Sequence, residues 1–271
     1  MTPLIFTLRE RPDQRLDLSP LVPHRLAGKQ AAEIERIELQ TTRVTVAVGD
    51  VFRLRMGEPS GVRIEGACDR LDRIGEALSG GEIEVVGDAG AQAGRLMSGG
   101  SLTIRGNAGP WAGSAMTGGR IEILHAAGDH LGAPFGGETV GMRGGVIVVR
   151  GGVGARAGDR MRRGTIVVEG PCGAYAASRM IAGTLVLLQD AGPLPGYLMK
   201  RGTIVLGAGC ERMSPTFIDC GTHDLVAMRL LADFVAAYSR RAGAILGRPL
   251  RRYAGDMAVL GKGEIFVGTR S

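Results

Sequence analysis

Six basic residues lie near the start of three successive short repeats in the middle of the chain, and a row of such cations can bind a polyanion. They are Arg160, Arg162, Arg163, Arg179, Lys200 and Arg201. Side chains at one corner of stacked repeats lie about 4.8 Å apart, so these cations would form a strip. The strip could hold a polyanionic tail, an acidic subunit or nucleic acid. Because nucleic-acid binding favours interleaved aromatic rings and only Tyr175 and Tyr197 lie near, we expect a solvent-facing or subunit-facing strip and no nucleic acid.

A second group that could do chemistry is His125, Asp129 and His130, because two imidazoles and a carboxylate can bind a metal ion. These residues stand beside a seven-residue insertion at about residues 133–141. A long loop on one repeat ordinarily carries polar residues without binding a metal, so we expect no metal site here. A loop that interrupts a regular repeat more often marks a contact with a partner.

Residues 152–157 fit the dinucleotide-binding fingerprint G-x-G-x-x-G/A. That fingerprint binds pyrophosphate only where a strand leads into it and a helix follows, within a unit of about 30 residues. The next expected strand begins near Thr165, too soon for such a helix. We therefore interpret Gly154 as a backbone bend.

The rest of the sequence offers no catalytic site. It contains no recognisable Ser/His/Asp triad, no paired catalytic carboxylates and no setting for a reactive cysteine. Cys68, Cys172, Cys210 and Cys220 have no Cys-x-x-Cys spacing, which argues against zinc and iron–sulfur sites. We expect a chain without catalytic residues and without a cofactor of its own.

Composition sets the broad class. Among 271 residues there are 45 glycines, and the net charge is +6. Only Lys29, Lys200 and Lys262 are lysines among the 33 basic residues. The N-terminal segment has no apolar run long enough for a signal peptide or a membrane span, so we expect a cytoplasmic protein without a membrane partner.

A repeat must position all of these residues. Seven units begin with a bulky apolar residue, counted here as repeat position 0: Leu78, Met97, Met116, Met142, Met161, Met180 and Met199. Each step is nineteen residues except Met116 to Met142, which is twenty-six. Repeat position 3 is always glycine, and positions 5 and 7 are always aliphatic, which is the alternation of a half-buried strand. Position 12 is glycine in the first six units, which indicates a second bend.

A nineteen-residue unit with one strand cannot close a sheet alone, so the units must stack and pair their strands in parallel. This predicts an all-β fold: a right-handed parallel β-helix over residues 61–207, beginning with a degenerate coil at 61–66. Residues 1–60 would form an N-terminal β cap that covers the sheet edge, with a short strand at 43–48. Residues 208–271 would form a C-terminal extension that packs on the solenoid.

Within that extension, residues 222–241 are expected to form one helix. Thr222 would cap its start and Gly243 would end it. Four residues at a spacing of four would form its apolar stripe. They are Val226, Leu230, Phe234 and Tyr238.

The repeat and the end of the chain together resemble a known family. The register M-x-G-G-x-I-x-V-x-G-x-x-G-x-x-x-G, clearest in residues 97–113, 142–158 and 161–173, resembles the glycine-rich β-helix domain of the glutamate synthase large subunit. It is equally similar to the C subunit of formylmethanofuran dehydrogenase. The end of the chain favours the C subunit, because Pro215-Thr216-Phe217, the following helix and residues 252–266 resemble its tail. The resemblance covers about residues 40–268.

Two versions of that subunit exist, one in the tungsten or molybdenum enzyme of methanogens and one in the bacterial formyltransferase/hydrolase complex of methylotrophs. The preference for arginine over lysine, with abundant alanine, suggests a GC-rich bacterial genome and favours the bacterial version. The resemblance implies a complex that transfers a formyl group from formyl-tetrahydromethanopterin to methanofuran and hydrolyses formylmethanofuran to formate. It implies a formyltransferase subunit, a metal-dependent amidohydrolase-like subunit and a further subunit as partners. The C subunit would be a non-catalytic scaffold.

The resemblance also gives the strip a partner, because methanofuran bears a glutamate-rich tail. The residues from Arg160 to Arg201 would hold that tail or an acidic subunit. Three alternatives stay open: the C subunit of the methanogen dehydrogenase, a spacer protein of a glutamate synthase whose catalytic domains are separate chains, and a standalone binding module for acidic polymers.

Overall fold

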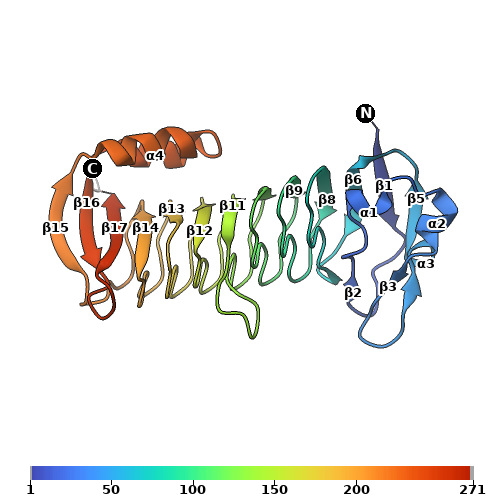
Figure 1. The fold of residues 1–271 in the computed structure, drawn as a ribbon, viewed down its shortest axis with the longest axis horizontal. Helices are drawn as coiled ribbons and strands as arrows, with labels where there is room; N and C mark the ends of the chain where they lie inside the picture. Colours follow the sequence, from blue (N-terminus) through green and yellow to red (C-terminus); the bar gives the residue numbers. More distant parts are fainter. Residues whose placement is uncertain (1, 269–271) are drawn as a thin grey trace.

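The computed structural model describes residues 2–268. The molecule is elongated, and its strands stand side by side along the long axis (Figure 1). One sheet of 13 strands runs through it, in the order β15-β16-β17-β14-β13-β12-β11-β10-β9-β8-β6-β1-β5. Most neighbours in this sheet are parallel, so the expectation of a mostly parallel all-β architecture is confirmed.

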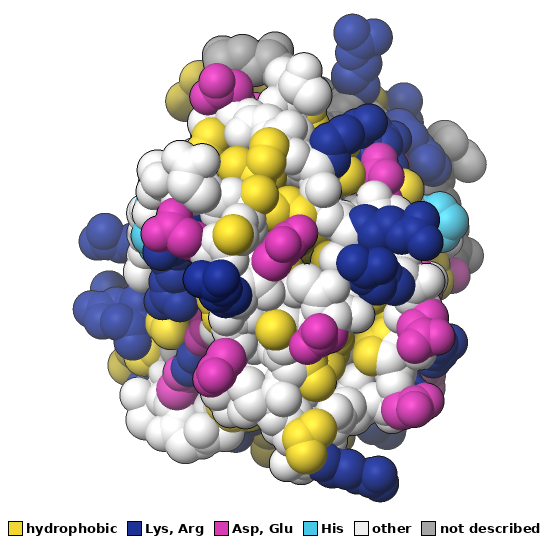
Figure 2. Space-filling model, turned by 90° about the vertical axis from the view of Figure 1, so that its right-hand side faces the viewer, with side chains coloured by type: hydrophobic (Ala, Val, Ile, Leu, Met, Phe, Trp, Pro, Cys, Tyr) yellow, Lys and Arg dark blue, Asp and Glu magenta, His cyan; other side chains and the backbone are white. Residues whose placement is uncertain are grey.

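The N-terminal end of the sheet is built from β1 (Pro3–Leu8), β5 (Phe52–Arg55) and β6 (Glu58–Ala67). β1 pairs in parallel with β6 and antiparallel with β5, which is the edge strand. Seven short elements surround them: β2 (Leu16–Asp17), α1 (Pro23–Leu26), α2 (Ala31–Glu35), β3 (Glu38–Leu39), β4 (Val46–Ala47), α3 (Val48–Val51) and β7 (Leu71–Asp72). Seen end-on, this cap carries basic, acidic and apolar side chains intermixed (Figure 2).

The expected strand at residues 43–48 is wrong in extent. Only Val46 and Ala47 pair, with β3, and Val48 already begins α3. The hydroxyl of Thr41 accepts the backbone N–H groups of Arg43 and Val44, at 3.1 and 2.9 Å. This turn satisfies those donors locally and keeps them out of a β-ladder.

The repeat forms the middle of the sheet as seven successive parallel strands: β8 (Glu82–Gly87), β9 (Ser101–Ile104), β10 (Arg120–Ile123), β11 (Arg143–Val149), β12 (Arg163–Val168), β13 (Thr184–Leu187) and β14 (Arg201–Leu206). Each residue pairs with its own copy, so that Ile121 lies between Leu102 and Ile147. Repeat positions 5 and 7 are buried, as predicted. A second ladder of single parallel bridges joins the residues at position 11, among them Ala108, Ala127 and Val153.

Close contact between coils explains the glycine at repeat position 3. Gly100 has φ +71°, and a Cβ there would lie 2.5 Å from the carbonyl oxygen of Gly81 in the preceding coil. A side chain would therefore meet both a strained backbone and a neighbouring chain.

The backbone conformation at repeat positions 14 to 18 was not foreseen from the sequence. At repeat positions 14 and 18 non-glycine residues adopt the left-handed conformation, as at Trp111 (φ 59°) and Arg156 (φ 60°). Their N–H groups donate across the coils, Trp111 to the Asp129 carbonyl at 3.0 Å and Arg156 to the Ala174 carbonyl at 2.8 Å. These inter-coil hydrogen bonds hold a conformation that costs such residues free energy.

The seven additional residues of the long step lie in a loop at residues 133–141, which protrudes from the stack (Figure 1). Pairing on either side is unaffected, because Ile121 still pairs with Ile147 and Ala127 with Val153. The insertion is therefore confined to one turn.

At the C-terminal end, β17 (Lys262–Gly268) pairs in parallel with β14, followed by antiparallel β16 (Leu250–Gly255) and β15 (Ile218–His223). α4 (Val226–Ala236) lies over this part of the sheet (Figure 1), and α5 (Arg240–Leu246) packs with it against the sheet. They form a second core with outward-facing residues of the sheet, including Val186, Val205 and Phe266.

The single helix expected at residues 222–241 is wrong. Thr222 belongs to β15, and α4 begins after Leu225. The helical segment is interrupted at Ser239, whose hydroxyl accepts the N–H of Ala242 at 3.2 Å and caps the start of α5. Gly243 lies inside α5, where a Cβ would be 2.7 Å from the Ala236 side chain, so it permits close packing of the two helices.

Three of the four residues of the expected apolar stripe face outward, and the fourth, Tyr238, lies beyond the end of α4, half-buried against Arg120. Val226, Leu230 and Phe234 are 69%, 66% and 45% exposed, whereas Met228 and Val235 are buried against the sheet. α4 is apolar on both faces, so its spacing pattern alone could not select the buried one. None of the helices in the described part of the chain has the length and apolarity that a membrane span requires.

Candidate functional site

Four of the predicted strip residues lie where a coil turns into its sheet strand. Arg162, Arg163, Lys200 and Arg201 occupy repeat positions 1 and 2, between a buried methionine and a glycine with positive φ. The methionine fixes the corner from inside and the glycine lets the chain bend, so the two intervening side chains project outward. All four basic residues are exposed.

Strand pairing adds two cations that the sequence reasoning missed. Arg143 pairs with Arg163, and Lys262 pairs with Arg201. We call the set Arg143, Arg162, Arg163, Lys200, Arg201 and Lys262 the cationic edge. Within residues 2–268 none of its side chains forms an ion pair. Like charges on neighbouring strands repel one another, so an anion bound along this edge would relieve that repulsion.

The other two predicted residues, Arg160 and Arg179, are already partnered. The Arg179 Nε and Nη2 groups donate to the two carboxylate oxygens of Asp159, both at 3.1 Å, and Ser178 Oγ donates to the same carboxylate at 2.5 Å. Arg160 Nε lies 3.9 Å from it. Asp159 is only 4% exposed, so these contacts compensate a buried charge. The structure thus separates a free cationic edge from a paired cluster.

Several charges on the outer face of the first five units are also paired. Arg63 Nη1 donates to Glu84 at 2.9 Å, and Arg150 bridges Glu122 and Glu169 at 2.5 and 2.8 Å. The cationic edge therefore differs from this face in lacking carboxylate partners in the described chain.

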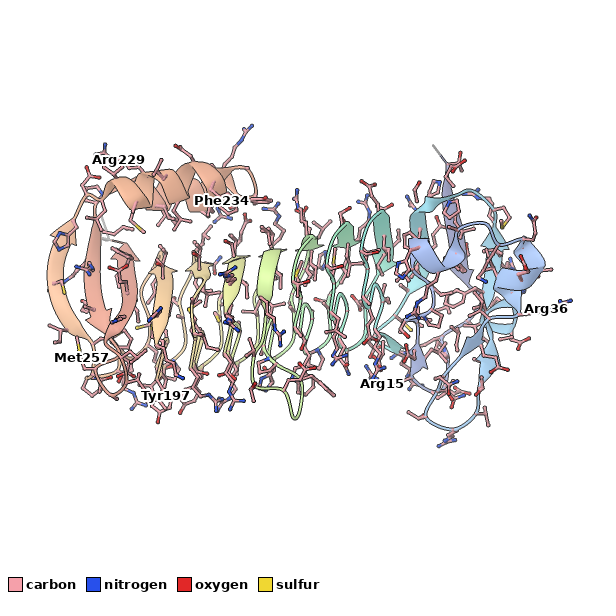
Figure 3. All side chains as sticks on the ribbon, viewed as in Figure 1. Arg15, Arg36, Tyr197, Arg229, Phe234 and Met257 are labelled. Atoms are coloured by element: carbon pink, nitrogen blue, oxygen red, sulfur yellow. The ribbon has the colours of Figure 1, made fainter. Side chains whose placement is uncertain are left out.

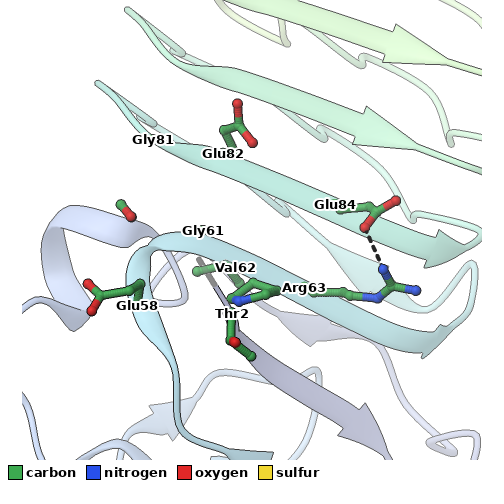
Figure 4. A pocket seen from close by; sticks show the side chains of 10 residues that line it. Thr2, Glu58, Gly61, Val62, Arg63, Gly81, Glu82 and Glu84 are labelled. Atoms are coloured by element: carbon green, nitrogen blue, oxygen red, sulfur yellow. Dashed lines mark hydrogen bonds and ion pairs between the residues drawn. The ribbon is translucent and has the colours of Figure 1, made fainter.

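A hollow of 460 Å³ lies where the N-terminal cap meets the first coils, and its lining is acidic (Figure 4). Glu84 accepts from Arg63, while Glu58 and Glu82 extend in different directions. The carboxylates are not brought together as a general acid and base would be.

His125, Asp129 and His130 have different surroundings and do not form a common site. The His130 ring stacks on Trp111 with centroids 5.2 Å apart and an interplanar angle of 4°. Asp129 Oδ1 accepts the N–H of Ala155 at 2.7 Å, and His125 is exposed. Over residues 2–268 there is no group of three His, Cys, Asp or Glu side chains that could hold a metal ion.

The insertion folds back over the preceding coils. The Phe135 ring meets Trp111 edge-on at 5.5 Å, and the Arg95 guanidinium lies 5.7 Å from the Phe135 ring centre. Glu138 and Glu76 both accept from Arg95, at 2.5 and 2.8 Å. Burial opposes the charge of Arg95, but these carboxylates outweigh it, so the pKa of Arg95 is raised. Contact of this loop with a partner stays a prediction.

The dinucleotide-like segment at residues 152–157 is part of the regular coil. Val153 belongs to the position 11 ladder, and Gly154 packs against Asp129. A turn, not a helix, leads to β12. The helix N-terminus that would bind pyrophosphate is therefore missing from this segment.

The four cysteines are free thiols. Cys172 lies in the position 11 ladder and is 5% exposed. Its burial raises the pKa of the Cys172 thiol to about 12, because a thiolate is poorly solvated in an apolar environment.

We expect Cys172 to resist alkylation at pH 8 in the folded protein. With a pKa of about 12, only about one Cys172 thiol in ten thousand would be ionised at that pH. Iodoacetamide treatment followed by peptide mass spectrometry should label Cys220, on the edge strand β15, well before Cys172, and denaturant should abolish the difference. Equal labelling rates in the native protein would contradict the burial described here.

The C-terminal helices could have been anticipated from repeat position 6. This outward position carries Glu84, Thr103 and Glu122 in the early coils. It is valine in the four later repeat coils, at Val148, Val167, Val186 and Val205. An outward face that becomes apolar requires a cover, which α4 and α5 provide for the last three.

Comparison with known proteins decides the family. The chain is 50% identical to the C subunit of the formyltransferase/hydrolase complex Fhc of Methylorubrum extorquens, over 96% of this chain and 98% of that protein. It belongs to the family of Fhc C subunits. No protein-family model matches the chain.

A solved structure agrees with this family assignment. One chain of the crystal structure of the formyltransferase/hydrolase complex FhcABCD from Methylorubrum extorquens, in complex with methylofuran, superposes with a TM-score of 0.95. The match has 43% sequence identity and covers 98% of this chain and 100% of that one. The ligand there is methylofuran, where the sequence-based expectation named methanofuran.

Similarity to the methanogen enzymes is narrower. The C subunit of the tungsten-containing formylmethanofuran dehydrogenase 2 of Methanococcus maripaludis is 32% identical, over 33% of this chain and 34% of that protein. The C subunit of the molybdenum-containing formylmethanofuran dehydrogenase 1 of Methanosarcina barkeri is 36% identical over 33% of this chain. The bacterial version predicted from arginine usage is thus the one that matches end to end.

Proposed function

We propose that this chain is a non-catalytic scaffold subunit of a formyltransferase/hydrolase complex in the cytoplasm. That complex would transfer a formyl group from formyl-tetrahydromethanopterin to a furan cofactor of the methanofuran type and hydrolyse the product to formate. Family membership supports this proposal, and so does the dispersed placement of the carboxylates and imidazoles. The free thiols suit a reducing compartment.

In this proposal the fold is a right-handed parallel β-helix at residues 61–207, between a cap at 1–60 and an extension at 208–271. Its partners are a formyltransferase subunit, an amidohydrolase-like subunit that holds the metal, and a further subunit. The relative of known structure comes from a complex named FhcABCD, which supports a heteromeric assembly.

The observation that carries a binding role is the cationic edge. Its six basic side chains lie in two groups, one at β11 and β12 and one at β14 and β17, separated by β13, whose coil has Ile181 and Ala182 at these positions. Within residues 2–268 none of the six has an ion-pair partner. We propose that it holds the glutamate-rich tail of the cofactor or an acidic surface of a neighbouring subunit. Both ligands are polyanions, which exposed cations attract from a distance.

Charge reversal at Arg162 and Arg163 tests this role. The double variant Arg162→Glu/Arg163→Glu should lower either the yield of assembled complex or its coupled turnover at least about tenfold at low salt, because it replaces attraction by repulsion. The chain would be co-expressed with its partner subunits and the complex measured by native mass spectrometry and formate release, at several salt concentrations.

The matched control is Arg36→Glu/Arg53→Glu, which makes the same charge change at exposed arginines of the N-terminal cap. This control should assemble and turn over normally. If the Arg162/Arg163 variant behaved like the control at every salt concentration, the binding role of the cationic edge would be rejected.

A further inference from the structure

A hollow of 330 Å³ opens at repeat positions 14 to 18 of the fourth, fifth and sixth units. Its lining is aromatic, aliphatic and cationic. The lining residues are Arg156, Tyr175, Arg179, Leu194, Tyr197 and Leu198. Figure 3 shows Tyr197 at the edge of the molecule opposite α4.

The walls are ordered by contacts within the chain. The Arg156 guanidinium lies 5.1 Å from the Tyr175 ring centre, and the Tyr175 and Tyr197 rings meet edge-on at 5.9 Å. Arg179 is held by Asp159 through two hydrogen bonds. Arg156 forms no ion pair in the described residues, and Tyr197 is 41% exposed. The hollow therefore offers one uncompensated cation beside two aromatic rings.

In the earlier coils, a comparable surface at repeat positions 14 to 18 is covered by a segment of this chain, which shows the kind of side chains it can bind. There the insertion covers repeat position 14 with the Phe135 ring, edge-on against Trp111. Its Glu138 carboxylate meets Arg95 at 2.5 Å. One short segment thus supplies an aromatic ring and a carboxylate, three residues apart, to an aromatic ring and a guanidinium.

The hollow presents the same two chemical groups without a covering segment. Tyr175 stands at repeat position 14, as Trp111 does, and Arg156 supplies the guanidinium. A volume of 330 Å³ is at the lower end of the range of about 300–1,000 Å³ for ligand pockets, so it suits a few side chains. A polyanionic tail suits the cationic edge better, because that edge presents six exposed cations in two groups along the sheet.

We propose that the Arg156–Tyr197 hollow binds a short protein segment of another subunit, one that carries a carboxylate and an aromatic or large apolar side chain. The carboxylate pairs with Arg156, and the apolar side chain packs against Tyr175 and Tyr197. This inference rests on the proposed function only in that the segment belongs to a subunit of the same complex.

A photo-crosslinking experiment on the co-expressed complex tests the occupant. Tyr197 is replaced by p-benzoylphenylalanine in the full chain, and cross-linked peptides are identified by mass spectrometry. We expect a cross-link to one segment of another subunit that contains Asp or Glu within about four residues of an apolar or aromatic side chain. The same photoreactive residue at Arg36, at the far end of the molecule (Figure 3), should not reach that segment.

Two substitutions then test the chemistry. Arg156→Glu should reduce retention of the cross-linked subunit at least about tenfold, and Arg156→Gln should reduce it less, because only the first introduces repulsion. Arg36→Glu is the matched control. Far-ultraviolet circular dichroism and the melting temperature of each purified variant check that the coil has folded.

The outcomes separate this inference from the proposed function. A complex that assembles normally with Arg156→Glu, or a Tyr197 cross-link to a second copy of this chain or to the cofactor tail, would overturn the inference and leave the scaffold role standing. A wild-type chain that co-purifies with no other subunit would overturn both.

Discussion

Replacing Gly100 by alanine is expected to lower the free energy of unfolding by about 3 kcal/mol. Gly100 has φ +71°, which costs a non-glycine residue about 1–2 kcal/mol. The added methyl group would also lie 2.5 Å from the carbonyl oxygen of Gly81, a contact that forces the coils apart. Because the strands on both sides pair through this corner, the distortion cannot be confined to one residue. Urea unfolding followed by circular dichroism gives the difference.

Gly80 supplies the control in the neighbouring coil. A Cβ added at Gly80 would have no heavy atom within 4 Å, and the residue has no positive φ. Gly80→Ala should therefore change stability little, or raise it slightly by restricting the unfolded chain. Similar losses for Gly80→Ala and Gly100→Ala would show that glycine at repeat position 3 is not dictated by inter-coil contact.

Asp159→Ala should be comparably damaging, at about 3 kcal/mol. The Asp159 carboxylate is buried and accepts hydrogen bonds from Ser178 Oγ and from both donor groups of Arg179. Its removal leaves a buried hydroxyl and a guanidinium without their acceptor. Asp159→Asn should be less harmful, because the amide oxygen still accepts one or two of these bonds. Urea unfolding measures both variants.

An exposed ion pair provides the comparison for Asp159. Asp219 pairs with Arg251 at the surface, and hydrogen bonding to that arginine lowers the pKa of the Asp219 carboxyl. Solvent and salt screen such a pair, so Asp219→Ala should have a much smaller effect on stability. Equal losses at Asp159 and Asp219 would mean that burial does not determine the strength of the Asp159 cluster.

The sheet was predictable because its information is local and repeated. The aliphatic residues at repeat positions 5 and 7 predicted which residues of successive strands pair. Ile121, at position 5, lies between Leu102 and Ile147, which stand at the same position of their own repeats. The twenty-six-residue step correctly placed the loop at residues 133–141. A fixed period fixes register, since every residue meets its own copy.

The C-terminal helices were harder to predict, because the face of α4 that is buried depends on sheet residues far away in the sequence. The stripe Val226, Leu230 and Phe234 has helical spacing, but Met228 and Val235 face the sheet. The competing faces of α4 are both apolar, and only the valines of the later coils decide between them. Those valines stand in one column, at repeat position 6, and such an apolar column indicates that the later coils need a cover.

The candidate site was predicted in part. Arg162, Arg163, Lys200 and Arg201 lie exposed at one edge, as expected. Lys262 lies beside them because β17 pairs with β14. The segment between these two strands contains β15, α4, α5 and β16 and does not follow the repeat, so the pairing could not be predicted from the repeat period. Arg179 and Asp159 stand at positions 18 and 17 of neighbouring coils. Side chains one coil apart are neighbours, so their pairing could have been read from the sequence.

The confinement of the insertion has a consequence for how this chain can change in length. Between Met116 and Met142, seven extra residues leave the pairing of Ile121 with Ile147 intact. The strand pairing between units is therefore preserved when one whole repeat unit is gained or lost. It is also preserved when residues are inserted at the turn that carries the loop at residues 133–141. A single residue gained within a strand would turn every later side chain of that strand to the opposite face. Evolution can thus lengthen this molecule, or decorate one of its turns, without redesigning the coils on either side.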